Sequence, residues 1–168
     1  MELRDAILGR RSVRSFRPDP VPDWLVEELL GLARWAPSAG NLQDWFVYVV
    51  RSKEAKRALA EASFGQKFVS EAPVVLVVCA DLKRAAYYGR RVITLYAIQD
   101  TAAFVYAFML LAYERGLGTV WVGAFDENAV RAILRIPAHL RPVAIVPVGF
   151  PARPPVNPGR EGVRVRYV

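Results

Sequence analysis

A cluster of arginines near the start of the sequence is the first group of residues that could bind a ligand. Arg10, Arg11 and Arg14 lie within five residues of one another, with the Ser12 hydroxyl between them. Guanidinium groups bind phosphate through paired hydrogen bonds, and a serine adds one more donor. The stretch therefore indicates a phosphomonoester site. A solvated basic face or a nonspecific nucleic-acid contact is the alternative, and it is the stronger interpretation of this stretch in isolation.

Two other stretches combine small residues with hydrogen-bonding groups. In 36–45, small residues would let a flat ligand approach the backbone, and Ser38, Asn41 and Gln43 can donate and accept hydrogen bonds around a heterocycle. An ordinary loop between a helix and a strand explains this segment equally well. In 116–125, glycines flank a short apolar run, which suggests close backbone approach. Neither a dinucleotide-binding GxGxxG motif nor a P-loop is present there.

Composition excludes several kinds of site. The 168 residues include one histidine, His139, and one cysteine, Cys79, so a two-histidine metal site and an intramolecular disulfide are ruled out. The net charge of +7 suits an anionic ligand. A charged N-terminus without an apolar stretch after it does not resemble a signal peptide, and we expect a cytoplasmic protein. The length predicts a single domain, 1–168.

The periodicity of apolar residues predicts an α+β protein. We expect helices and strands in alternation, with an extended tail at the end; the helices are 2–8, 23–35, 52–62, 92–113 and 126–134, the strands are 45–50, 74–79, 120–122 and 143–148, and the tail is 151–168. The helix at 92–113 is long and apolar enough to cross a membrane, but Asp100 lies near its middle. We therefore interpret it as a core helix that also packs against a second subunit.

The order of these segments resembles the nitroreductase family of FMN-dependent oxidoreductases. The segment 10–16 (RRSVRSF) is similar to the family's RRSxRxF motif, and 36–45 (APSAGNLQDW) to its APSxxNxQPW motif. The segment 116–123 follows the long helix in the family's place, and 148–151 (VGFP) resembles the turn before the family's tail. The resemblance covers nearly the whole chain. It implies a mostly antiparallel central sheet flanked by helices, with the long helix at a homodimer interface.

The resemblance also implies a cofactor and an activity. FMN would bind non-covalently at two sites per homodimer, NADH or NADPH would donate hydride to flavin N5, and a nitroaromatic, quinone or similar acceptor would be reduced by a ping-pong mechanism. The cofactor carries the chemistry, so no catalytic side chain is expected. A flavin-binding module without turnover is one alternative, and a basic nucleic-acid-binding protein is another. Neither a membrane nor a metal is expected.

Site residues follow from the same resemblance. Those expected at the FMN phosphate and ribityl chain are Arg10, Arg11, Ser12, Arg14 and Arg160. Those expected at the isoalloxazine ring include Pro37, Ser38 and Asn41, which would come from the other subunit, and Gln43. Gln66 is expected at the pyrimidine edge of the ring. The remaining residues expected beside the ring are Trp121, Val122, Gly123 and Ala124. Two positions depart from the family. Asp44 stands where a proline is usual and would add a negative charge near the site, and Pro158 stands near where some members have lysine.

Overall fold

A four-stranded antiparallel sheet is the centre of the computed structural model, which describes residues 1–168. The strands lie in the order β1-β2-β4-β3, with bounds β1 Trp45–Val50, β2 Val74–Asp81, β3 Gly118–Thr119 and β4 Leu140–Gly149. All but the last residue of β2 are buried, because β2 and β4 form the interior of the sheet and are covered on both faces. The predicted α+β class and mostly antiparallel sheet are confirmed.

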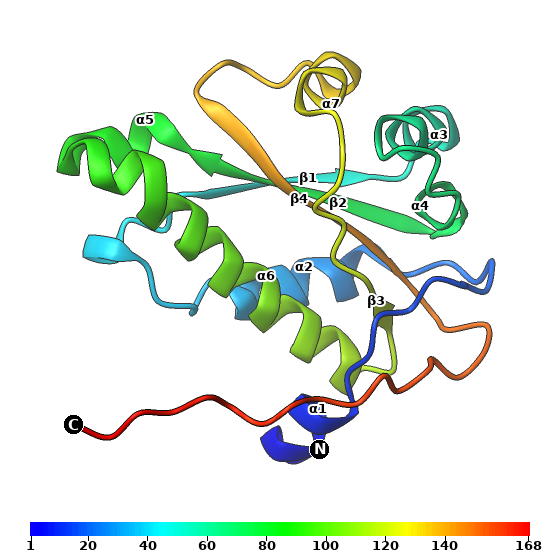
Figure 1. Ribbon diagram of the computed structural model, residues 1–168. Coiled ribbons are helices and arrows are strands. Elements are labelled where there is room, and N and C mark those ends of the chain that lie inside the picture. The colour runs from blue at the N-terminus through cyan, green and yellow to red at the C-terminus, as the bar shows by residue number, and fades with distance from the viewer.

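Helices cover both faces of this sheet (Figure 1). The α-helices are α1 Leu3–Gly9, α2 Asp23–Ala33, α3 Lys53–Ala62, α4 Phe68–Glu71, α5 Leu82–Ala85, α6 Ala97–Glu114 and α7 Glu127–Leu134. Alternate residues of β2 enter different cores, since successive side chains of a strand point to opposite faces. Leu76 packs with α2 and α6 on one face, whereas Val77 packs with α3, α4 and α7 on the other.

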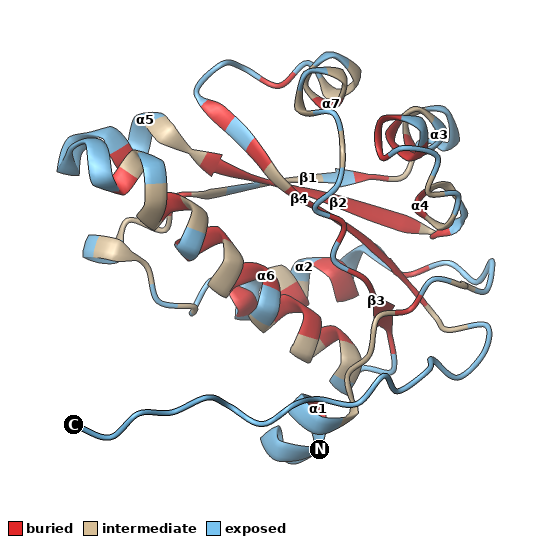
Figure 2. Ribbon diagram, viewed as in Figure 1, coloured by how far each residue is buried: buried red, intermediate tan, exposed pale blue.

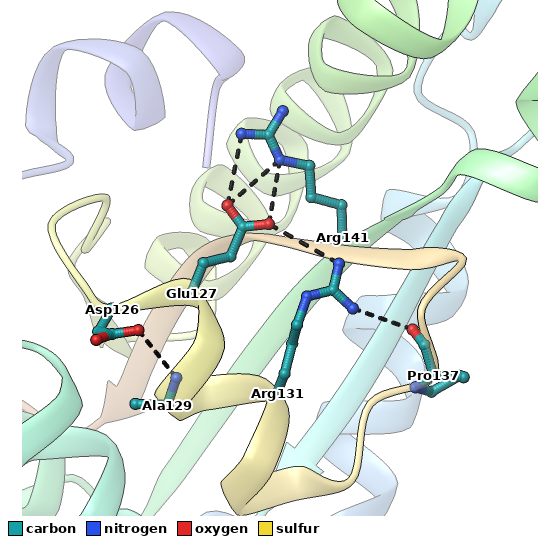
Figure 3. Close-up of polar contacts among 6 residues, drawn as sticks. All are labelled: Asp126, Glu127, Ala129, Arg131, Pro137 and Arg141. Atoms are coloured by element: carbon teal, nitrogen blue, oxygen red, sulfur yellow. Dashed lines mark hydrogen bonds and ion pairs between the residues drawn. The ribbon is translucent and has the colours of Figure 1, made fainter.

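Local side-chain contacts define two predicted helix starts. The Ser52 hydroxyl accepts a hydrogen bond from the Ala55 amide at the start of α3, and the Asp126 carboxylate accepts one from Ala129 at the start of α7. Figure 3 shows how α7 is then fixed to β4: Glu127 lies between Arg131 of its own helix and Arg141 of β4, 3.3 Å from the Arg141 Nε.

The long apolar helix begins with a π-helical segment, Val92–Tyr96, and continues as α6. One side of α6 is buried against the sheet and α2, including Phe104, Val105 and Phe108. The other side is partly open, with Tyr106 exposed (Figure 2). Its length and composition would also suit a membrane span. The burial of its inner face makes it a core helix of this fold.

The strand predicted at 120–122 is wrong in its bounds. The antiparallel register pairs Gly118 with Gly149, Thr119 with Val148 and, further along, Val122 with Ile145. In that register position 120 faces Pro147, which has no amide hydrogen to donate. The ladder is therefore interrupted, so that β3 ends at Thr119 and Val122 forms only a single bridge. Residues 163–168, at the end of the tail, are exposed and pair with no strand.

Candidate functional site

The arginine stretch and the C-terminal tail face each other across a pocket of about 740 Å³. The segments that line it lie near β3 and the C-terminal end of α6, where the tail passes beside α1 (Figure 1). It is lined by Arg11, Ser12, Val13, Arg14, Ser15, Arg153, Pro154, Pro155, Val156, Pro158 and Arg160. We call it the arginine pocket. The structure thus brings together four of the predicted residues from segments almost 150 positions apart in the sequence.

Backbone pairing positions the first wall of the arginine pocket. The Val13 amide donates to the Thr119 carbonyl at 3.0 Å, and Ser12 forms a parallel bridge with Thr119. The Val13 side chain is buried against Gly118, where an added Cβ would lie 2.6 Å from Val13 Cγ2. Gly118 therefore permits the close approach, while Ser12 and Arg14, on either side of Val13, line the pocket.

The arginines of the pocket are held in different ways. Arg11 donates to the Leu8 and Arg10 carbonyls and, from Nε, to Asn157 Oδ1 at 3.1 Å, so it ties the first wall to the tail. Arg14 is exposed, with its guanidinium carbon 5.9 Å from the centre of the Phe68 ring. Four guanidiniums and no carboxylate line the pocket, which favours an anion carrying more than one charge.

Arg10 lies beside this pocket and has an unsatisfied donor. Its Nη1 is buried and has no hydrogen-bond partner in the chain. Burial lowers the pKa of the Arg10 guanidinium, Arg160 and Arg11 lower it further, and Tyr106 opposes the shift. A buried donor without a partner is costly. A bound anion would satisfy it and would offset the charge of the neighbouring arginines.

Arg153 lines the arginine pocket, although it was not among the residues we expected there. It follows the turn at 148–151, where the Ala152 amide donates to the Ser15 carbonyl and fixes the start of the tail against the first wall. The only sequence signal that Arg153 could line the pocket was its position two residues after Pro151, at the start of the tail. The path of the tail is set by contacts distant in the sequence, so that signal was weak.

The segment 120–124 continues from β3 towards Gln66. The Gln66 side-chain amide donates to the Ser63 and Ala124 carbonyls, at 2.9 and 3.3 Å. Trp121, Gly123 and Ala124 are exposed, and the amides of Gly123 and Ala124 donate to no group of the chain. This leaves two backbone donors free on an open surface.

Val122 differs from the other members of that segment. Its side chain is buried in the core, and its amide and carbonyl both pair with Ile145. The Val122 side chain is therefore not available to a ligand, and a contact of this residue with the flavin stays a prediction. The strand bridge that fixes Val122 also orients its exposed neighbours.

The second predicted binding segment, the loop 36–44, lies at the other end of α6. The Ala39 amide donates to Asp100 Oδ2 at 3.0 Å, near the N-terminal end of that helix. The helical rise of about 1.5 Å per residue places Asp100 roughly 20 Å from the last residue of α6, near which the arginine pocket begins. Within one chain, the loop 36–44 and the arginine pocket therefore lie far apart.

The loop has an unusual backbone that internal hydrogen bonds support. Gly40, Asn41 and Gln43 have positive φ angles of 58°, 55° and 50°. The Ser38 hydroxyl accepts from the Gln43 amide at 2.9 Å, and the Gln43 side chain donates to Asn41. Gln43 thus stabilises the loop, whereas Pro37 and Asn41 are exposed and Ser38 is partly so.

Asp44 at the end of the loop is completely buried, and neither carboxylate oxygen has a hydrogen-bond partner. Burial, and after it the negative charge of Asp100, raise the pKa of Asp44 to about 6. The Asp44 carboxyl therefore lies inside the protein, beneath the loop, and a negative charge near the site stays a prediction.

No side chain in the chain resembles an activated nucleophile. Cys79 is buried in β2, and burial raises the pKa of its thiol to about 12, so it is protonated at neutral pH. His139 is exposed in the turn before β4, and its carbonyl accepts from the Leu82 amide. These positions suit a protein that binds its reactive group rather than supplying it.

Comparison with known proteins finds one family. The nitroreductase family model matches residues 7–69 and 61–150. The chain is 41% identical to a protein named NADH dehydrogenase from Thermus thermophilus, over 90% of this chain and 88% of that protein. It is 29% identical to a Bacillus subtilis protein named as an NAD(P)H FMN reductase, over 90% of this chain and 66% of that protein. The structure of a nitroreductase family protein from Clostridium novyi superimposes with a TM-score of 0.82 at 29% identity, over 90% of this chain and 86% of that one.

Proposed function

The chain belongs to the nitroreductase family and is an FMN-dependent NAD(P)H oxidoreductase, and we propose that it transfers hydride from NADH or NADPH, by way of flavin N5, to a nitroaromatic, quinone or similar acceptor in a ping-pong mechanism. The arginine pocket is the observation that carries this proposal, because a mononucleotide needs a fixed site for its dianionic phosphate. FMN supplies the redox chemistry when it is bound. The protein supplies position and charge.

The phosphate of FMN would lie in the arginine pocket. Ser12, Arg14 and Arg160 provide donors from both walls, and Arg11 holds the walls together. The free Nη1 of Arg10 fits the same role. Arg153 adds a further positive charge to this site. The donor set therefore suits a dianionic phosphate ester.

The flavin ring would lie along the exposed residues Trp121, Gly123 and Ala124. Small residues at Gly123 and Ala124 leave room for a flat ring, and their free amides are the donors available near N5. A backbone donor and the surrounding positive charge would stabilise the reduced, anionic flavin. Gln66 lies beside Ala124 and would reach the pyrimidine edge.

A homodimer completes the site in this proposal. The loop residues Pro37, Ser38 and Asn41 lie near the end of α6 that is remote from the arginine pocket of their own chain, too far to share one FMN with it. Two copies packed through the partly open side of α6, with the helices antiparallel, would bring the loop of one chain to the pocket of the other. The exposed tail, with Val163 and Tyr167 about nine-tenths exposed, would be covered by the second copy. We place this enzyme in the cytoplasm.

The visible spectrum of the purified protein with added FMN, before and after anaerobic NADH or NADPH, tests this function. We expect a bound-flavin spectrum that bleaches with the reduced nicotinamide and returns on adding a quinone. Bound flavin that neither nucleotide bleaches would overturn the oxidoreductase and leave a flavin-binding module. Absence of flavin binding, with salt-sensitive binding of DNA, would instead support a nucleic-acid-binding protein.

A further inference from the structure

Asp44 and Asp100 form a pair of buried acids beneath the loop 36–44. Asp44 has none of its surface exposed and Asp100 only 7%. Asp100 uses one oxygen to accept the Ala39 amide, in the middle of the loop. Asp44 ends the loop, and its backbone carbonyl accepts from the Asp81 amide at 2.7 Å. One carboxyl group is therefore bonded to the middle of the loop, and the other belongs to its last residue.

Two ionised carboxylates cannot form a hydrogen bond with each other. Each would be an acceptor only, and neither Asp44 oxygen has any donor from the rest of the chain. One proton placed between the two acids supplies the missing donor, and the resulting hydrogen bond to a charged acceptor is of the strong kind. The charged groups that act on the Asp44 carboxyl are Asp100 on α6 and Asp81 at the end of β2, and both are acidic.

We propose that Asp44 and Asp100 share one proton, and that this buried pair is a positioning element that holds the loop 36–44 in the shape in which Ser38 and Asn41 meet the flavin. The flavin contact rests on the function proposed above, whereas the shared proton does not. With the proton, the pair ties the end of the loop to α6. Without it, two negative charges face each other in a buried place and push the loop from the helix.

The pair makes the loop dependent on pH. Burial and the neighbouring Asp100 charge raise the pKa of Asp44 from 3.8 to about 6, so the native protein holds a proton that the unfolded chain releases. Between about pH 4 and about pH 6 the native state binds more protons than the unfolded state, so the contribution of Asp44 to stability falls as the pH rises through this window. Above it, the contribution stays at its lower value.

The Ala39 amide is the direct reporter, since it donates to Asp100. We would follow its resonance by NMR in the flavin-free protein between pH 5 and pH 8. We expect it to titrate with a midpoint near pH 6 in the native chain, and to lose that step in Asp44→Asn, whose amide group donates to Asp100 at every pH. A flat Ala39 resonance in the native chain, or the same step in Asp44→Asn, would overturn the shared proton.

Thermal unfolding of the same flavin-free proteins gives a second measure. We expect Asp44→Asn to melt about 5 °C above the native chain at pH 8 and to match it near pH 4, below the window in which native Asp44 loses stability. The control is Asp126→Asn, which changes another aspartate far from the pair and should not reproduce this pattern. A variant that melts lower than the native chain at both pH values would show that Asp44 serves packing alone.

FMN titrations then separate this inference from the proposed function. We expect the native protein to lose FMN affinity several-fold between pH 5.5 and pH 8, and Asp44→Asn to lose less. Equal losses in the two proteins would contradict the positioning role. Failure of both proteins to bind FMN at any pH would contradict the proposed function, while the Ala39 titration would still decide the shared proton.

Discussion

The two ends of α6 solve different binding problems. At its C-terminal end, the arginine pocket presents guanidinium groups around an open volume, and simple strand pairing between Val13 and Thr119 places them. At its N-terminal end, the loop 36–44 presents small and neutral residues, and its charges are buried beneath it as Asp44 and Asp100. In the proposed site, the first end would recognise the charge of the ligand and the second its shape. A ligand with an anionic tail and a flat ring needs both.

The difference between the ends also concerns how each can fail. The arginine pocket depends on a rigid frame and on side chains that project from it. The loop depends on its backbone, which has positive φ angles at Gly40, Asn41 and Gln43. At the first end, substitutions that disturb the backbone frame should have large effects on stability and FMN binding, and substitutions that remove an arginine should have intermediate effects on FMN binding. At the second end, substitutions should act by changing the conformation of the loop.

The largest effect is expected from Gly118→Val, which attacks the frame of the arginine pocket. The new side chain would collide with Val13, because even a Cβ would lie 2.6 Å from it. We expect about 3 kcal/mol less stability in urea unfolding and loss of most FMN binding. Gly31→Val, at an exposed position of α2, is the matched control, since nothing lies within 4 Å of a Cβ there. Full stability and FMN affinity in Gly118→Val would show that the close approach is not needed.

An intermediate effect is expected from Arg14→Ala, which removes charge but leaves the frame. A charged hydrogen bond to phosphate contributes roughly 1.5–3 kcal/mol, so FMN should bind about 10–150-fold more weakly by fluorescence titration, with unchanged unfolding. The control is Arg17→Ala, an exposed arginine that pairs with Asp19 outside the pocket. Equal FMN affinity in the native protein and Arg14→Ala would remove Arg14 from the site.

The smallest effect is expected at the loop, where backbone and side chain can be separated at Asn41. Its φ angle is 55°, a region that glycine adopts freely and β-branched residues avoid. Asn41→Val should cost about 1–2 kcal/mol of stability, and Asn41→Gly close to none, in thermal unfolding. Equal stability of the two variants would show that the backbone of the loop carries no strain.

Local signals predicted the elements of this fold better than its long-range contacts. Ser52 and Asp126 begin their helices as expected, because a capping bond joins residues three apart. The end of β3 was missed because it depends on Pro147 in another strand. Such an interruption cannot be seen until the register of the two strands is known.

The same distinction applies to the candidate site. The arginines and Ser12 could be predicted from their spacing, and the structure gathers them with Arg160. Arg153 and the burial of Asp44 could not, since one depends on the path of the tail and the other on packing against α6. Charged residues indicated that a ligand binds, but three-dimensional packing decides which charges face it.

A mixed dimer tests most directly whether the two ends of α6 form one site across two subunits. Chains carrying Arg14→Ala and Asn41→Val would be produced together with different tags, and the heterodimer would be titrated with FMN. The shared site predicts that each heterodimer binds one FMN with native affinity, because one pocket and one loop remain intact on opposite chains. The other site combines both substitutions and should bind FMN more weakly than either variant alone. Two weakened sites, one with the affinity of the Arg14→Ala protein and one with that of the Asn41→Val protein, would show that each chain binds FMN on its own.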